Sequence, residues 1–576
     1  MANSNGISSF HFGKNVYLLG LNVSRRGQRA FYSGITRGKS NLEGCCKTLQ
    51  DRKVSSRKIN TELKPRNRKN HPNESLTSRS VVQGSFLKVF RTHQCFNSRT
   101  FVTSQRLRLQ EPWMISDYEV NSLVNRCETA ASVNRGIIDR YETNQLASNQ
   151  PVEDRKFVVS LLHEDGEHLF GVLDGHGGDS CAQSVSHRLP DYIGLALLPP
   201  EILMELGNDV PDVREYLTMT SDSEHNGYNY MDDPICRQSL YKYFKKLKKM
   251  YVSKGYHVGS NLKQRSSRGL FTSFAEFHDV RTSFKMNALS HAFLSLDEDI
   301  SAEALRFDEA GKVNEHAFAA ANAGACALVA HINGTELCIA NTGDCRAVLG
   351  VENENKSWSA IQLSSDHTTG NPGEVERIVS QHPPEEATTC IEYERLLSRL
   401  APLRAFGDVR FKWDSKTQKE VYSKSNSSVR YFTEKEHLYT PPYLTAEPEL
   451  TSYQLQRSDK FLVLATDGLW DMLSNEEVVH YVKAHVNKKN GAEREKTSME
   501  ITYNKQELPC EMLNSASCLI REALGGDDHV SVSTSLSIPF PDVRRYRDDM
   551  TIIVVFFDWD QLEIPSESEQ DFPLII

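Results

Sequence analysis

Short apolar runs that alternate with turn residues fill the chain from about Pro112 onward. Two β-rich runs, at 156–162 and 168–173, flank an Asp-Gly turn and predict a hairpin that ends at Asp174. Further strands are predicted at 325–331, 336–340, 346–351, 461–465 and 551–557. The first three of these are joined by short turns, which predicts an antiparallel meander.

Longer stretches with apolar residues at helical spacing predict helices over 116–141, 179–197 and 284–305. Antiparallel strands interspersed with long helices indicate an α+β fold with layered packing rather than a doubly wound parallel sheet. Polar stretches that are too long for tight connections are expected to be surface insertions, where partner recognition tends to lie. They cover about 206–232, 252–270, 412–440 and 486–507.

The composition is that of a globular protein, with 39% hydrophobic and 25% charged residues among 576, which is enough to bury a sizeable core. No apolar run approaches the roughly 18 to 20 residues that cross a bilayer, so no transmembrane segment is expected. The 12 cysteines form no C-x-x-C pair, which favours reduced thiols over a zinc ribbon or a disulfide framework.

Charge divides the chain into two parts, because residues 1–110 carry a net charge of +17 and the remainder −26. The first 42 residues contain no Asp or Glu, and their arginines alternate with serines and apolar residues. This composition is typical of an organelle transit peptide, and Arg29–Ser33 resembles a mitochondrial processing site. The alternative is a basic arm that binds nucleic acid. The interleaving favours the transit peptide, so no nucleic-acid partner is expected, and 1–110 is set apart from the fold as transit peptide and disordered segment.

Four aspartates stand directly before or after predicted strands: Asp154, Asp174, Asp467 and Asp548. A lone aspartate in such a place is usually a turn or capping residue. Acids at the ends of several core strands can converge on one edge of a sheet, where like charges are costly unless cations neutralise them. Carboxylate oxygens suit Mg²⁺ or Mn²⁺ better than zinc, and a pair of such ions supports phosphoryl displacement.

The four aspartates belong to a series of six motifs. In chain order these are Val152–Asp154, Phe170–Gly178, Asn341–Arg346, Arg404–Asp408, Leu464–Trp470 and Arg547–Thr551. Over about 110–560 the chain thereby resembles the metal-dependent, type 2C serine/threonine protein phosphatases. The resemblance implies a four-layer α/β/β/α sandwich with a central antiparallel β-sandwich. It also implies a catalytic domain at 111–560 that contains the insertions, followed by a tail at 561–576.

The resemblance further implies that two divalent cations, Mg²⁺ or Mn²⁺, are bound. Asp174 would bridge them, the Gly175 carbonyl would ligate one, and Glu153 would hold a metal-bound water. Asp154, Asp467 and Asp548 would complete the site. Asp344 lies where some relatives bind a third ion, but the position is equally consistent with an ordinary turn aspartate that binds no metal.

His176 is expected to donate a proton to the leaving serine oxygen, since a side chain that titrates near neutrality suits this role; the alternative is a surface turn histidine. Asp408 is expected to organise a loop beside the site. Asn149 stands where the family usually has a phosphate-gripping arginine. Phosphate binding is therefore assigned to Asn149 and the metals, with Arg155 as a further candidate.

Within the family, the segments Phe406–Trp413, Pro441–Glu449 and Tyr546–Val555 are similar to the mitochondrial pyruvate dehydrogenase phosphatases. This similarity implies a matrix enzyme that dephosphorylates the alpha subunit of pyruvate dehydrogenase. It would dock on the lipoyl domain of the acetyltransferase core, with Ca²⁺ at that interface and a possible regulatory subunit. The alternatives are a mitochondrial phosphatase with another substrate and an inactive scaffold, although a scaffold would be expected to have lost metal aspartates.

Overall fold

The computed structural model describes residues 114–161, 167–206, 217–219, 230–253, 274–425, 440–496 and 514–561. All of them belong to one compact unit, Ser104–Ile576. Segment 1–110, nearly all of the tail 561–576 and most of the predicted insertions lie outside the described residues. Within them, no helix is long and apolar enough to cross a membrane.

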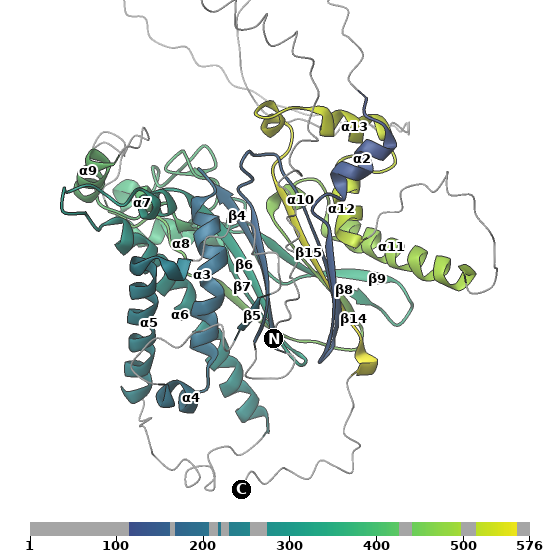
Figure 1. Ribbon diagram of the computed structural model, residues 1–576, viewed down its shortest axis with the longest axis horizontal. Helices are drawn as coiled ribbons and strands as arrows, with labels where there is room; N and C mark the ends of the chain where they lie inside the picture. Colours follow the sequence, from purple (N-terminus) through teal and green to yellow (C-terminus); the bar gives the residue numbers. More distant parts are fainter. Residues whose placement is uncertain are drawn as a thin grey trace, which may run out of the picture. The chain divides into compact units, whose positions relative to one another are not determined.

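Two antiparallel sheets form the centre of this unit (Figure 1). The first has six strands, in the order β1 (Thr129–Arg135), β2 (Ile138–Leu146), β15 (Met550–Phe557), β14 (Asp459–Ala465), β8 (Arg346–Glu352) and β9 (Trp358–Gln362). The second runs β13 (Glu449–Gln454), β7 (Glu336–Thr342), β6 (Gly324–Asn333), β4 (Glu167–His176), β3 (Arg155–Leu161) and β5 (Leu217–Met219), and β12 (Phe406–Gly407) pairs with β6.

A continuous apolar core lies where the two sheets face each other. Phe170, Leu328, Leu462 and Ile553 belong to it, contributed by β4, β6, β14 and β15, and all four are fully buried. Burial of this many aliphatic and aromatic groups supplies the main driving force that holds the sheets together.

Helices cover the outer face of each sheet, which confirms the predicted α/β/β/α layers (Figure 1). The second sheet is covered by α3 (Ser180–Leu197), α6 (Phe274–Ala304) and α7 (Glu315–Asn322), and α5 (Pro234–Ser253) packs on α3 and α6. The first sheet is covered by α11 (Asn475–Lys496) and α12 (Ser515–Ala523). The remaining α-helices are α2 (Asp117–Val124), α4 (Pro200–Glu205), α8 (Pro372–Gln381), α9 (Ser415–Lys424), α10 (Asp467–Trp470) and α13 (His529–Ser537).

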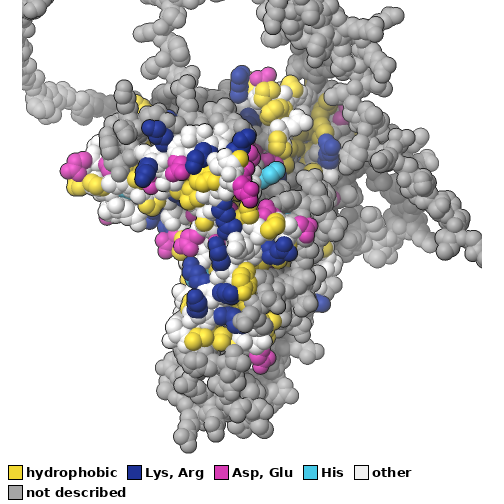
Figure 2. All heavy atoms as spheres, turned by 60° about the vertical axis from the view of Figure 1, so that its left-hand side comes forward, with side chains coloured by type: hydrophobic (Ala, Val, Ile, Leu, Met, Phe, Trp, Pro, Cys, Tyr) yellow, Lys and Arg dark blue, Asp and Glu magenta, His cyan; other side chains and the backbone are white. Residues whose placement is uncertain are grey.

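The outer helix α5 shows why these elements are amphipathic. Leu240, Phe244 and Leu247 are buried against the helical layer, while the exposed lysines recur at helical spacing on the opposite side, at Lys242, Lys245, Lys246 and Lys249. Figure 2 shows the side of the molecule on which α5 lies, with many Lys and Arg side chains at its surface.

Two sequence-based predictions of secondary structure are wrong. The helix expected over 116–141 ends at Val124, and the rest forms β1 and β2, because β2 completes the sheet beside β15. The expected meander is also wrong: β6 pairs with β7, but β8 crosses to the other sheet and pairs with β14 and β9. A smaller difference is that β4 extends to His176, past the predicted end of the hairpin at Asp174, because it continues to pair with β6.

Candidate active site

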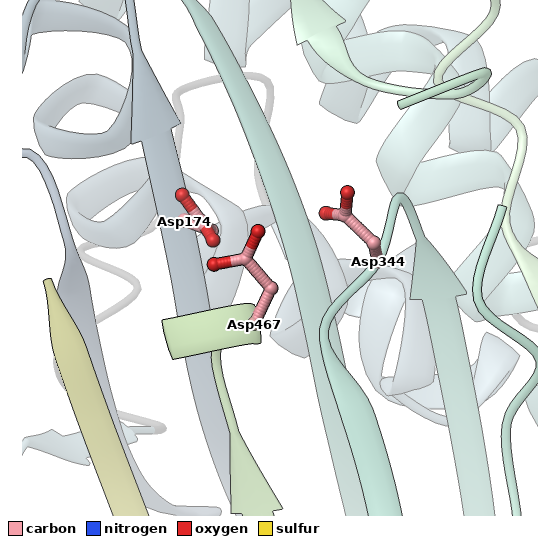
Figure 3. Close-up of side chains that lie close together, drawn as sticks. All are labelled: Asp174, Asp344 and Asp467. Atoms are coloured by element: carbon pink, nitrogen blue, oxygen red, sulfur yellow. The ribbon is translucent and has the colours of Figure 1, made fainter. Parts of the chain in front are cut away.

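Three aspartates from distant parts of the chain meet at one end of the sandwich: Asp174, Asp344 and Asp467. Each has a carboxylate oxygen within 4.8 Å of an oxygen of the other two. Figure 3 shows Asp174 beside Asp467, with the carboxylate of Asp344 pointing toward them. Asp154 lies outside this group of three but acts electrostatically on Asp174.

The topology of the two sheets explains this convergence. Asp174 lies near the end of β4 in the second sheet, and Asp467 begins α10 directly after β14 in the first. Asp344 lies in the turn where the chain leaves β7 and crosses to β8 in the opposite sheet. Strands β4 and β7 both pair antiparallel with β6, so they run in the same direction and end at the same edge of the sheet. The turn after β7 therefore places Asp344 near Asp174.

Crowding makes this group electrostatically unfavourable. Burial, followed by the charges of Asp467, Asp154 and Asp344, raises the pKa of Asp174 well above its usual value. Burial and the charge of Asp344 do the same to the pKa of Asp467. Carboxylates brought this close are stabilised when cations neutralise them, and oxygen donors are what Mg²⁺ and Mn²⁺ prefer. The donor set therefore fits the divalent cations that the sequence predicts.

Glu153 and Asp154 border the group. Thr466 Oγ1 donates to Asp154 Oδ2 at 2.8 Å, and burial raises the pKa of both carboxyls. Glu153 Oε1 accepts from the Gly178 N–H at 2.7 Å. Gly178 has a φ of +119°, a conformation that favours glycine, and this turn lets the backbone N–H point at Glu153.

Gly175 lies in β4 between Asp174 and His176. A Cβ atom at this position would overlap with the backbone carbonyl of Glu153, so any larger residue would push the two segments apart. The close approach keeps the predicted metal-ligating carbonyl of Gly175 on a strand that is packed directly against Glu153.

Asp548 and Asn149 lie at the more exposed rim. The Asp548 side chain is 43% exposed and pairs with Arg544. It lies outside the group of three carboxylates, although its charge contributes to raising the pKa of Asp467. Asn149 Nδ2 donates to Asp549 Oδ2 at 3.0 Å and approaches Asp548 Oδ1 at 3.5 Å.

His176 and Asp408 form an ion pair beside the carboxylates. His176 Nε2 lies 2.5 Å from Asp408 Oδ2, and Asp408 is buried. Burial alone would lower the pKa of His176, but the charge and hydrogen bond of Asp408 outweigh it and raise the pKa. The carboxylate of Asp408 therefore favours the protonated form of His176, the form that can donate a proton.

Comparison with known proteins is consistent with this geometry. The family model "Protein phosphatase 2C" matches residues 208–512, more than half of the chain. The human mitochondrial [pyruvate dehydrogenase [acetyl-transferring]]-phosphatase 1 is 36% identical over 79% of this chain and 84% of its own length. The chain belongs to the protein phosphatase 2C family.

Other relatives in this family agree. Human [pyruvate dehydrogenase [acetyl-transferring]]-phosphatase 2 is 36% identical over 73% of this chain and 78% of its own length. The phosphatase 1 of Saccharomyces cerevisiae is 29% identical over 78% of this chain and 74% of its own length. A solved serine-threonine phosphatase 2C from Toxoplasma gondii overlaps loosely, with a TM-score of 0.39 and 15% identity over 75% of this chain and 99% of that one. The family match and the relatives that are 36% identical show that the chain is a protein serine/threonine phosphatase, as predicted.

This type 2C phosphatase site also contains three residues that the sequence analysis missed: Asp549, Asp471 and Arg544. Asp549 is buried and accepts the N–H groups of Asn149 and Glu153, both at 2.8 Å, so it shapes the loop before β3. Asp471 follows Asp467 by four residues, and its pKa is raised by burial and by Asp344. The adjacent acids Asp548 and Asp549 were a visible signal, whereas nothing in the sequence linked Arg544 to Glu153.

Proposed function

We propose that this phosphatase hydrolyses phosphoserine on a protein with two divalent cations, Mg²⁺ or Mn²⁺. The observation that carries the proposal is the convergence of the Asp174, Asp344 and Asp467 carboxylates beside the paired His176 and Asp408. The proposed ligands are the carboxylates of that group, two further carboxylates and one carbonyl, namely Asp154, Asp174, Asp344, Asp467, Asp548 and Gly175.

When bound, the cations would activate a water molecule and neutralise the phosphoryl oxygens. Glu153 is proposed to orient that water, since the Gly178 N–H fixes its Oε1. His176 is proposed to protonate the departing serine oxygen. With Nε2 engaged by Asp408, the proton would leave from Nδ1, the other ring nitrogen. Asp408 then stabilises the charged ring and fixes its orientation. A phosphate-binding role for Asn149 stays a prediction.

The proposed substrate is the phosphorylated alpha subunit of pyruvate dehydrogenase. Two human relatives that are 36% identical over most of this chain are named as pyruvate dehydrogenase phosphatases, and their names include a mitochondrial location. That location supports mitochondria as the place of action, and we propose the matrix. Docking on the lipoyl domain of the acetyltransferase core, a Ca²⁺ at that interface and a regulatory subunit remain predictions from the sequence.

The test is phosphate release from phosphorylated pyruvate dehydrogenase by the full chain with Mg²⁺, at increasing Ca²⁺, with and without added lipoyl domain. We expect release from pyruvate dehydrogenase to exceed release from an unrelated phosphoserine protein, and added lipoyl domain with Ca²⁺ to increase it further. Equal rates on both proteins would contradict the substrate assignment. Rates of phosphate release that do not change when lipoyl domain is added would contradict the predicted docking on that domain.

A further inference from the structure

Arg544 connects two acids of the site that lie far apart in the sequence. It belongs to the 3₁₀ helix Asp542–Arg545, which precedes β15. Its Nη1 lies 3.0 Å from Glu153 Oε2, and its Nη2 lies 3.1 Å from Asp548 Oδ2. Among the described residues, it is the one Arg or Lys that pairs with a carboxylate of the predicted metal site. Its side chain is still 41% exposed, so part of the guanidinium faces solvent.

Two other arginines near the site are held by the protein itself. Arg155 donates from Nε to Gln183, from Nη1 to the Val152 carbonyl at 2.7 Å, and from Nη2 to Asp179 at 2.9 Å. Arg547 donates from Nη1 to the Ala147 carbonyl at 3.0 Å. Arg155 would have to break several hydrogen bonds to reach a ligand, which argues against the phosphate-binding role suggested for it above.

A substrate phosphate brings more negative charge to a site that is already crowded with carboxylates. Arginine opposes this charge better than other cations do, because its planar fork can donate to two phosphate oxygens at once. The present partners of Arg544 are Glu153 and Asp548, two of the residues that we propose for the metal site. Divalent cations there would take over the neutralisation of these acids and leave the guanidinium able to turn to another anion.

We infer that Arg544 binds the phosphate group of the substrate. The inference rests on the proposed function. Asn149, at the position first considered for this role, carries no charge, and its side-chain amide donates to Asp549 at 3.0 Å. Asn149 therefore holds the loop before Glu153. Arg544 supplies the positive charge close by, since Asn149 Nδ2 and Arg544 Nη2 lie 3.5 and 3.3 Å from the same Asp548 Oδ1.

The test measures the affinity of the Mg²⁺-loaded full chain for inorganic phosphate by calorimetry, together with kcat and KM on a phosphoserine peptide. Arg544→Ala should weaken phosphate binding about tenfold or more, the loss expected for a charge-assisted hydrogen-bonded pair. Arg544→Lys should lose less, since it keeps a point charge but not the fork. The matched control is Arg545→Ala, because Arg545 lies next along the same helix, is 78% exposed and pairs only with Asp542 among the described residues. It should bind phosphate like the wild type.

Unchanged phosphate affinity in Arg544→Ala would overturn the inference. An equal loss of Mg²⁺ and phosphate affinity would also overturn it, because that result marks a purely structural ion pair. If Arg544→Ala does not fold, Arg544→Lys decides: weaker phosphate binding supports the inference, and wild-type binding rejects it. A wild type that binds phosphate but hydrolyses no phosphoserine peptide would instead contradict the proposed function.

Discussion

His176 Nε2 and Asp408 Oδ2 lie 2.5 Å apart, although the two residues are separated by 232 positions in the chain. Asp408 has a φ of +49°, in the left-handed region, and its N–H donates to the Ala323 carbonyl at 2.9 Å. The loop therefore holds the carboxylate in a fixed position beside His176. Asp408 does more than organise a loop, the role expected from the sequence, because it is the direct partner of the proposed proton donor.

Asp408→Asn should impair proton donation while the loop stays intact, because asparagine tolerates the left-handed conformation. We expect kcat on a phosphoserine peptide to fall about 10- to 100-fold, which is part of the roughly 10²- to 10⁴-fold that general acid catalysis contributes. Hydrolysis of p-nitrophenyl phosphate should fall much less, since p-nitrophenolate departs without being protonated. Comparing kcat on the two substrates checks this, and equal losses on both would argue against His176 as the acid.

Gly324→Ala should separate the same pair without removing either group. A Cβ atom on Gly324 would overlap with His176 Nε2 and with Asp408 Oδ2. We expect the same selective loss on the phosphoserine peptide, together with a destabilisation of about 1–3 kcal/mol from overpacking. Gly370→Ala is the control, because a Cβ atom there stays 3.4 Å from its nearest neighbour. A Gly324→Ala enzyme with wild-type kcat on both substrates would refute the dependence on this pair.

The sequence predicted the members of the carboxylate group better than it predicted their surroundings. Asp174 and Asp467 follow strongly apolar runs, so their places at strand ends could be predicted from local pattern alone. The pairing of His176 with Asp408 could not, because it depends on where β12 joins β6. The position of Asp344 likewise depends on β8, which crosses to the other sheet. The sequence did not indicate this crossover, because the short turn after β7 is also what a meander would have.

Away from the site, Glu374 in α8 is a test of buried electrostatics. Burial alone would raise its pKa, but hydrogen bonds from Arg404 and Arg377 outweigh this effect and hold the pKa at about 2. Because this value lies below the ordinary 4.5 of the unfolded chain, the stabilisation is complete above about pH 4.5 and is lost as the pH falls toward 2. Glu374→Gln should therefore lower the free energy of unfolding by about 2–3 kcal/mol at pH 7.

Denaturant unfolding of wild type and Glu374→Gln at several pH values checks this expectation. The difference between the two proteins should shrink as the pH drops below 4.5. The control is Glu376→Gln, two positions along the same helix and exposed, which should change stability little. A difference between wild type and Glu374→Gln that does not depend on pH would contradict the electrostatic origin.

The most direct test of the proposed metal site is to measure phosphate release from a phosphoserine peptide while Mg²⁺ is added back to chelator-treated protein. The wild type and the exposed-site control Asp527→Asn should be inactive without metal and regain activity with it. Asp174→Asn should stay on the order of 100-fold or more below them at every Mg²⁺ concentration, because it removes a ligand from the centre of the group. Full activity in chelator, or full Mg²⁺-dependent activity of Asp174→Asn, would contradict the assignment of these aspartates to a catalytic metal site.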